Sequence, residues 1–204
     1  MSFSVRSLAA TTLVTLLGTG VLWWGTDGFD AYTAEAVRRA EVLHAPRPLP
    51  AIVLEDQDGR PFSLQEYRGR LVAVDFIYTR CATLCRSLGT DFQRLRDRFP
   101  RGAQARDLAL VSISFDPGRD DSARLRKYGD TYAADGVRWR IARIRDKADL
   151  EPLLQAFGVV VIPDGLGGFE HNAAIHLIDR DSRLTRISDL GEAEELAQAI
   201  EKLL

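Results

Sequence analysis

The sequence predicts a mixed α/β domain behind an N-terminal membrane helix. Two stretches, Leu71–Tyr78 and Leu108–Phe115, are almost continuous runs of apolar residues, as expected of strands buried on both faces of a sheet. Between them, Leu84–Phe99 carries apolar residues at three- and four-residue spacing, which indicates a helix. Strands that alternate with helices imply right-handed crossovers. The thioredoxin-like fold, a central mixed sheet flanked by helices, matches this order of elements.

The other elements complete that pattern. Ile52–Phe62 forms a hairpin that turns at Asp58-Gly59, and Asp120 and Asp121 open a second helix, since acidic side chains suit the positive end of the helix dipole. The remaining predicted elements are a strand at Trp139–Ile144, a helix at Ala148–Phe157, a hairpin of Ala173–Asp179 with Leu184–Ile187, and a closing amphipathic helix at Glu192–Leu204.

The N-terminus predicts a membrane helix. Arg6 is the last charge before Ser7–Thr26, an uncharged run of 20 residues that spans about 30 Å as a helix. Trp23 and Trp24 lie at its far end, where aromatic rings suit the headgroup region. The alternative is a cleaved secretory signal, but the run is long for one and no Ala-x-Ala site follows promptly. Under both interpretations, the domain is exported to an oxidising compartment.

The charges that flank this run predict its orientation. Asp27 and Asp30 follow it and basic Arg6 precedes it, which favours the N-terminus inside and the remainder outside. We therefore expect a single-pass inner-membrane protein with an anchor at 1–26, a connector at 27–50 and a thioredoxin-like domain at 51–204 in the periplasm. The 27 basic and 29 acidic residues nearly cancel, so no basic field favours nucleic acid as a partner.

The two cysteines of the chain, Cys81 and Cys85, lie where the first buried strand gives way to a helix. In open α/β sheets, ligands bind beyond the carboxyl ends of the strands. A helix N-terminus also lowers a thiol pKa, because its partial positive charge favours the thiolate. Residues four apart share one helix face, so both sulfurs can point at one ligand, or form a disulfide if the first turn distorts.

A purely structural disulfide is one interpretation of this pair. Closing so short a loop restricts the unfolded chain little, so the bridge would stabilise the fold little, and a functional dithiol is favoured. Two thiolates do not complete a structural zinc site, which takes four protein ligands. Soft thiolates do suit Cu(I), and a third copper ligand should then be a histidine.

Three histidines are candidates for that ligand. His44 lies in the proline-rich connector, far in sequence from the sheet, and is expected to be solvated. His171 and His176 flank the last predicted hairpin strand and are five apart, so on a regular strand only one can point at the cysteines. His176 is mid-strand and expected to pack in the core. His171, at the sheet margin after a glycine-rich loop, is favoured, although a lone histidine is more often structural.

These segments resemble the Sco/SenC family of copper-binding thioredoxin-fold proteins over about residues 50–204. The matching stretches are Phe76–Cys85, Ser112–Pro117 and Glu170–Asp179. A CxxxC pair alone is a weak signal. Its position on a strand–helix turn, with a distant histidine before an Ile/Leu/Ile/Asp strand, makes the combination specific.

The resemblance implies copper binding by Cys81, Cys85 and His171, and a metallochaperone role in maturing the dinuclear copper centre of cytochrome c oxidase. The implied partners are the oxidase subunit that carries this centre and other periplasmic copper carriers, and a single N-terminal anchor is usual in the family. Asp116, at the end of the second strand, is a candidate for orienting a ligand or tuning local charge. Its alternative role is a turn cap beside Pro117.

The chain departs from the family pattern at four positions. Ala82 and Arg86 stand where a proline usually follows each cysteine, which leaves the first helical turn less rigid. Arg86 also adds positive charge, which favours thiolates but opposes cation binding. Glu170 replaces the usual aspartate before the histidine, and His176 replaces an aromatic residue, typically tyrosine. We expect these differences to affect the affinity for copper and the identity of the protein that receives it.

Two other functions share the fold. In a thiol–disulfide reductase, Cys81 and Cys85 would act catalytically on the copper-ligand cysteines of a partner; if the protein is an enzyme, this is the expected reaction. A peroxidase is disfavoured, because the signature Pro-x-x-x-Thr-x-x-Cys is absent. Asp75 and Thr79 lie six and two residues before Cys81, with no proline near.

Overall fold

The computed structural model describes residues 4–26, 28, 33–81, 84–100 and 106–204. The chain divides into two compact units, Met1–His44 and Ala45–Leu204. The first unit contains α1 (Val5–Gly25) and α2 (Ala34–His44).

Helix α1 covers the predicted apolar run. It has 21 residues, which reach about 30 Å at 1.5 Å per residue, and its side chains are exposed along its whole length. Its length and composition fit a membrane anchor or a signal sequence. Asp27 and Asp30, which were expected to mark its outer end, lie outside the described residues.

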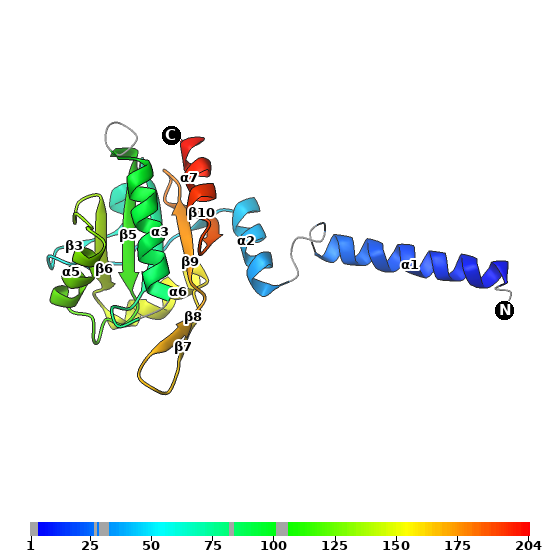
Figure 1. Cartoon of the computed structure of the whole chain (residues 1–204), viewed down its shortest axis with the longest axis horizontal. Helices are drawn as coiled ribbons and strands as arrows, with labels where there is room; N and C mark the ends of the chain where they lie inside the picture. The colour runs from blue at the N-terminus through cyan, green and yellow to red at the C-terminus, as the bar shows by residue number, and fades with distance from the viewer. Residues whose placement is uncertain (1–3, 27, 29–32, 82–83, 101–105) are drawn as a thin grey trace. The chain divides into compact units, whose positions relative to one another are not determined.

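The second unit is built on an eight-stranded sheet with the order β1-β10-β9-β4-β5-β6-β2-β3 (Figure 1). β4, β5 and β6 are parallel neighbours, and the other pairs are antiparallel. The mixed sheet confirms the predicted α/β architecture. The strands are β1 (Arg47–Pro48), β2 (Leu54–Asp56), β3 (Pro61–Phe62), β4 (Leu71–Ile77), β5 (Leu108–Ser114), β6 (Trp139–Ile144), β9 (Ala174–Ile178) and β10 (Arg183–Asp189).

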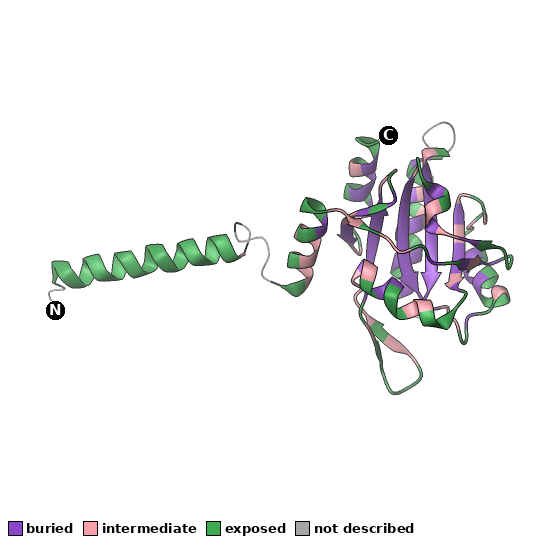
Figure 2. Ribbon diagram, turned by 180° about the vertical axis from the view of Figure 1, so that it is seen from behind, coloured by how far each residue is buried: buried purple, intermediate pink, exposed green. Residues whose placement is uncertain are grey.

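The sheet centre is the pair β4 and β5, in which every residue is buried (Figure 2). They pair in parallel without a shift, from Leu71 opposite Leu108 to Ile77 opposite Ser114. Burial on both faces explains why both strands read as continuous apolar runs. Because the strands are parallel and in register, the segments that follow them leave the sheet at the same edge.

Helices cover both faces of the sheet. Phe92 of α3 packs on Trp139 of β6 with ring centroids 5.5 Å apart. On the opposite face, Phe157 of α6 packs on Phe76 of β4 at 5.0 Å. α5 also contacts β6, and α7 lies against α3. The helical segments of this unit are η1 (Leu64–Tyr67), α3 (Leu84–Arg98), α5 (Ser122–Thr131), η2 (Lys147–Asp149), α6 (Leu150–Phe157) and α7 (Ala193–Glu201).

One hairpin was not predicted from periodicity. β7 (Val161–Pro163) and β8 (Phe169–His171) pair as a separate antiparallel sheet, where the sequence suggests only a glycine-rich loop. The Asp164 carboxylate closes the turn by accepting hydrogen bonds from the backbone N–H groups of Leu166 and Gly168. The hairpin projects from the main sheet (Figure 1), and Leu166 at its tip is 93% exposed. Strands of three residues carry too little alternation to be recognised in a sequence.

The contact between α3 and Tyr132 yields a stability prediction. A Cβ atom at Gly89 would lie 2.4 Å from the Tyr132 ring, and Tyr128 and Trp139 pack against that ring at centroid distances of 5.0 and 6.2 Å. Gly89→Ala gains about 1 kcal/mol of helix propensity, but displacing the ring costs about 1–3 kcal/mol. We expect a net loss of about 1 kcal/mol in the free energy of unfolding, measured in urea on the full chain in mild detergent.

Ser87→Ala, an exposed substitution on the same helix, is the matched control. It gains helix propensity without the clash and should be at least as stable as the wild type. If Gly89→Ala proves as stable as this control, the close packing of Tyr132 on α3 is contradicted.

Candidate metal centre

The two cysteines lie at the junction between β4 and α3. After β4 the chain turns, and the Cys81 N–H donates to the Tyr78 carbonyl at 3.1 Å. Cys85, in the first turn of α3, is fully buried, whereas Cys81 is partly exposed, and both are free thiols. The backbone N–H of Cys85 donates to the Sγ of Cys81 at 3.3 Å. The cysteines therefore lie at a strand–helix junction, as the sequence predicted.

The two thiols differ in their exposure and in the hydrogen bonds that they make. The hydrogen bond with the Cys81 sulfur raises the pKa of the Cys85 thiol, and burial of Cys85 raises it further. The Cys85 N–H, at the start of a helix, favours negative charge on the Cys81 sulfur. Cys81 is thus the more accessible sulfur of the pair. The raised pKa of Cys85 favours its protonated form.

His171 reaches this junction from a distant part of the chain. It is the last residue of β8, and its Nε2 lies 4.0 Å from the Sγ of Cys85, 86 residues away in sequence. Its ring packs on Phe115 with centroids 5.1 Å apart. Its Nδ1 is buried and has no hydrogen-bond partner among the described residues.

Aromatic side chains hold the hairpin that carries His171. Tyr78 and Phe115 follow directly after β4 and β5, and their rings lie 5.4 Å apart. Phe169 of β8 packs edge-on against both, at 5.3 and 5.5 Å, and the Tyr78 hydroxyl donates to the Phe169 carbonyl at 3.3 Å. Sequence reasoning missed this cluster. The signal that could have found it is an aromatic residue directly after each of two neighbouring parallel strands.

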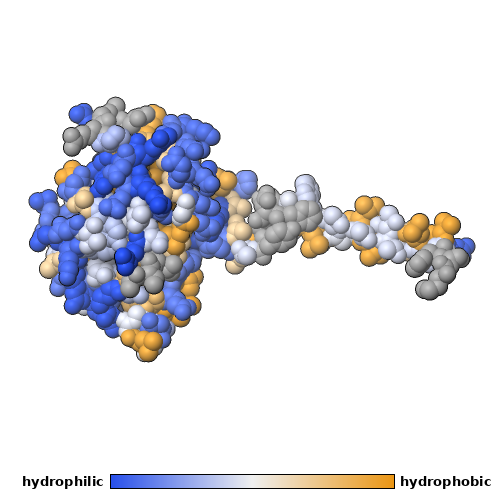
Figure 3. Space-filling view, viewed as in Figure 1, coloured by the Kyte–Doolittle hydropathy of each residue, from blue (hydrophilic) through white to orange (hydrophobic). Residues whose placement is uncertain are grey.

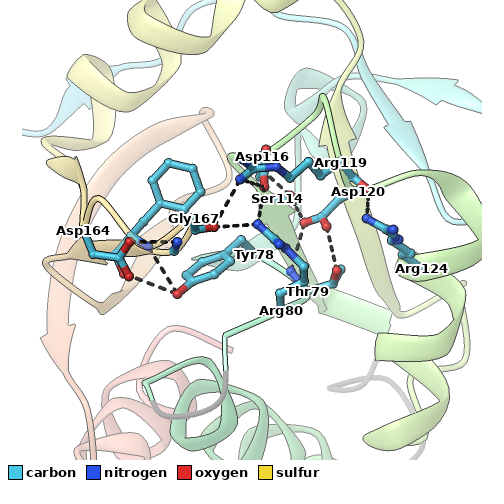
Figure 4. Close-up of polar contacts among 12 residues, drawn as sticks. Tyr78, Thr79, Arg80, Ser114, Asp116, Arg119, Asp120, Arg124, Asp164 and Gly167 are labelled. Carbon is cyan, nitrogen blue, oxygen red and sulfur yellow. Dashed lines mark hydrogen bonds and ion pairs between the residues drawn. The ribbon is translucent and has the colours of Figure 1, made fainter.

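Asp120 fixes the backbone just before Cys81 (Figure 4). Its buried carboxylate accepts hydrogen bonds from the Thr79 N–H at 2.9 Å, and from the hydroxyls of Thr79 and Ser114 at 2.6 Å each. The sequence predicted that Asp120 and Asp121 both serve the start of a helix. Only Asp121 caps α5, whereas Asp120 ties the cysteine loop to the end of β5.

Asp116 contacts the cysteine loop through an arginine (Figure 4). Its carboxylate accepts a hydrogen bond from Arg119 at 3.4 Å and lies 4.0 Å from the guanidinium of Arg80, next to Cys81. The same two guanidinium groups donate to the Gly167 carbonyl in the β7–β8 hairpin, at 2.6 Å from Arg80 and 3.2 Å from Arg119. Within the described residues, Asp116 makes no hydrogen bond to either cysteine or to His171.

The other two histidines are a core residue and an exposed residue of the N-terminal unit. His176 of β9 is fully buried and packs edge-on between Phe76 and Phe157, with centroids 5.7 and 5.3 Å away. It faces α6, on the side of the sheet opposite α3, so the prediction that it is a core residue is confirmed. His44 ends α2 and is exposed.

A buried carboxyl group lies on the α3 side of β4. Asp75 is fully buried, and burial raises its pKa to about 7 from the usual 3.8, partly offset by the neighbouring Ser112 hydroxyl. Asp91 of α3 adds a smaller repulsion that also raises this pKa. A negative charge on Asp75 would oppose ionisation of Cys85, whose pKa it also raises.

The arrangement supplies soft donors for a metal ion. The Cys85 sulfur and the His171 imidazole lie 4.0 Å apart, and Cys81 precedes Cys85 by one helical turn. Thiolate with imidazole suits copper better than a hard cation. Among the described residues, no group of three or more ligating side chains is already gathered for a metal. The Cys85–His171 pair is preformed, so Cys81 would have to turn toward it for all three to bind one ion.

Comparison with known proteins assigns the family. The family model SCO1/SenC matches residues 50–204. This chain belongs to the SCO1/SenC family. A protein of Stutzerimonas stutzeri named as copper-binding is 30% identical to this Sco/SenC chain over 153 residues, or 72% of each chain.

Solved structures confirm the fold of this Sco/SenC protein. ScoI of Bradyrhizobium japonicum, solved with copper bound, aligns with a TM-score of 0.66 and 24% identity, covering 77% of this chain and 99% of that one. The thioredoxin domain of a thiol–disulfide oxidoreductase from Bacteroides vulgatus aligns with a TM-score of 0.57 and 21% identity, covering 76% and 94%. The predicted thioredoxin-like fold is confirmed.

The structure places three of the four positions at which this chain departs from the Sco/SenC pattern. Arg86 is exposed in the first turn of α3, Glu170 is exposed in β8, and His176 fills the core position described above. Ala82 lies outside the described residues.

Asp75 predicts how stability depends on pH. Its pKa is about 7 in the folded protein and near its ordinary value when unfolded, so the folded state binds the proton more tightly. This stabilisation is complete below about pH 4 and is lost as the pH rises through about 7. Since each pKa unit corresponds to about 1.4 kcal/mol, the loss is on the order of 4 kcal/mol.

Asp75→Asn keeps the size of the side chain and cannot ionise. We expect the wild type to lose stability relative to this variant between pH 4 and 8, measured as the free energy of unfolding of both metal-free proteins at each pH. Two profiles that run parallel over this range would show that Asp75 is not a buried carboxyl with a raised pKa.

Proposed function

We propose that this protein binds one copper ion through the thiolates of Cys81 and Cys85 and the Nε2 of His171, and delivers it to the copper centre of cytochrome c oxidase. The observation that carries this proposal is the 4.0 Å approach of His171 Nε2 to Cys85 Sγ. Nothing in local sequence brings these residues together. The aromatic cluster around Phe169 holds the imidazole there, as a ligand position requires.

The chemistry of the donors supports a monovalent soft ion. Two thiolates and a neutral imidazole leave a Cu(I) site with one net negative charge, which the nearby Arg80 offsets. Metal binding would displace the proton that Cys85 otherwise retains, so affinity should rise with pH. Asp116 acts in this proposal through Arg80, by setting the position of that charge, and Asp120 keeps the cysteine loop in place.

The N-terminal segment supports delivery at a membrane. We assign residues 1–26 as an anchor in the inner membrane, 27–50 as a connector and 51–204 as the periplasmic domain. An anchored carrier explores a thin layer next to the membrane, where the client oxidase subunit also resides. Other periplasmic copper carriers would supply the ion.

A second function rests on a different observation, the asymmetry of the two thiols. A partly exposed Cys81 that accepts a helix N–H bond, beside a buried Cys85, suits a nucleophilic and a resolving thiol. On this alternative, the protein is a membrane-anchored reductase for the copper-ligand cysteines of its client. It needs no histidine ligand.

Replacing His171 distinguishes the two functions. His171→Ala should lower Cu(I) affinity by more than about a hundredfold, since even the residues that only orient a ligand are worth 10–100-fold. Competition with a Cu(I) chelator on the reduced full chain in detergent, without oxygen, measures this change. His44→Ala is the matched control, and its affinity should equal that of the wild type.

The reductase alternative predicts the opposite pattern. In that case wild type and His171→Ala would both bind copper weakly, and both would exchange with a disulfide substrate at the same rate. Tight binding of one copper per wild-type chain that survives in His171→Ala would instead remove the histidine from the proposed ligand set.

A further inference from the structure

A pocket opens beside the exposed sulfur of Cys81. Its volume is about 470 Å³, and it lies between the cysteine loop, the first turn of α3 and one face of α5. This volume is in the range of small-molecule sites, about 300–1,000 Å³. The pocket shares Cys81 and Arg80 with the site proposed above, but His171 and Cys85 are not among the residues that line it, and the proposed function leaves its α5 wall without a role.

The pocket walls are cationic. Arg124 and Lys127 come from α5, Arg86 from α3 and Arg80 from the cysteine loop, and no Asp or Glu is among the described residues that line the pocket. Arg86 and Lys127 form no ion pair within the described part of the chain, and Arg124 donates only to a backbone carbonyl, that of Arg119. The face over α3 and α5 is correspondingly hydrophilic (Figure 3).

The nearest carboxylates do not neutralise these walls. Asp120 is buried and occupied by Thr79 and Ser114. Asp121 caps α5. Asp116 lies 4.0 Å from Arg80, so it partly offsets one of the four cations. These carboxylates lie close by and reduce the local charge, but four cationic side chains line the space next to Cys81 and no carboxylate is among its described lining residues.

The pocket follows from the helical pattern of α5. Arg124, Lys127, Tyr128 and Thr131 are spaced three and four residues apart, so they share one face. That face is directed to the start of α3, because the Tyr128 hydroxyl donates to the Cys85 carbonyl at 3.1 Å. Tyr128 and Tyr132, both mostly buried, supply aromatic walls. The result combines an aromatic surface, a ring of cations and one accessible thiol.

We propose that this pocket binds a small thiol that carries carboxylates, about the size of a tripeptide, and that this thiol reduces the Cys81–Cys85 disulfide. The proposal rests on the proposed function, since copper binds only the reduced cysteines. Anionic groups suit the four cations, and the volume suits a small molecule better than a protein segment.

The reaction has two steps and uses two thiol molecules. The first thiolate attacks the exposed Cys81 sulfur; a mixed disulfide forms, the Cys81–Cys85 bond breaks, and Cys85 takes up a proton. In the mixed disulfide, the second thiolate attacks the sulfur that came from the first small thiol. This step releases the disulfide of the two small thiols and the Cys81 thiolate. Two electrons pass from the two thiols to the protein. Attack on Cys81 is favoured because Cys85 is buried.

The test compares three small thiols of different charge on the oxidised full chain in detergent. Mercaptosuccinate carries two carboxylates, 2-mercaptoethanol is neutral and cysteamine is cationic. Each rate is expressed per thiolate and divided by the rate of the same thiol with a neutral small-molecule disulfide, which removes differences in intrinsic nucleophilicity. We expect this ratio to be about tenfold higher for mercaptosuccinate than for cysteamine at low salt and to fall as salt screens the charges. The mercaptosuccinate rate should also saturate with concentration.

Lys127→Glu reverses one pocket charge on an exposed side chain. The attacking thiolate carries three negative charges in mercaptosuccinate and one in 2-mercaptoethanol, and it is zwitterionic in cysteamine. We therefore expect Lys127→Glu to lower the mercaptosuccinate rate by about tenfold or more, the 2-mercaptoethanol rate by less, and the cysteamine rate least. Lys202→Glu, at the end of α7, is the matched control and should leave all three rates unchanged. Equal rates for mercaptosuccinate and cysteamine, or an equal loss for all three thiols in Lys127→Glu, would overturn the proposal.

Copper binding separates this proposal from the proposed function. Lys127→Glu should bind Cu(I) with wild-type stoichiometry once it is fully reduced. A wild type that prefers mercaptosuccinate but binds no copper would support the anionic pocket and remove the copper role. A wild type that binds copper but shows no preference for anionic thiols would support the copper role and overturn the anionic-thiol pocket.

Discussion

The in-register parallel pairing of β4 with β5 is the constraint on which the site depends. It ends both strands at one edge, so Tyr78 and Phe115 emerge side by side and can hold the β7–β8 hairpin between them. The same register brings Thr79 within reach of Asp120. A shift by one residue would turn every side chain of one strand to the other face. The cysteine loop, the β7–β8 hairpin and α3 would then no longer be held in their present positions relative to one another.

The site combines a fixed part and a part that has to move. Cys85 and His171 are fixed, one in the first turn of a helix and the other against an aromatic ring. Cys81 is partly exposed, and its sulfur accepts a hydrogen bond from the backbone N–H of Cys85. This asymmetry permits two chemistries at one pair of sulfurs. Turned inward, Cys81 would complete a set of soft ligands; turned outward, it faces a cationic pocket suited to thiol exchange.

The sequence predicted most of the sheet, and it predicted that His176 is a core residue, because both rest on burial. Two continuous apolar runs are what strands covered on both faces require. The five-residue spacing argument assumed that one strand carries both histidines, but His171 ends β8 of the small sheet and His176 lies in β9 of the main sheet. Asp120 was misjudged for a physical reason. An acidic residue before a helix looks the same in sequence whether it caps that helix, as Asp121 does, or reaches back to Thr79. Only the register of β4 and β5 decides between these roles.

The central claim is that two sulfurs and one imidazole, from segments 86 residues apart, act on one copper ion. X-ray absorption at the copper edge of the reduced full chain, loaded with one equivalent of Cu(I), tests it most directly. We expect two sulfur donors and one nitrogen donor with imidazole scattering, and loss of the nitrogen in His171→Ala. A wild-type spectrum with sulfur donors alone, or one unchanged by the substitution, would contradict it.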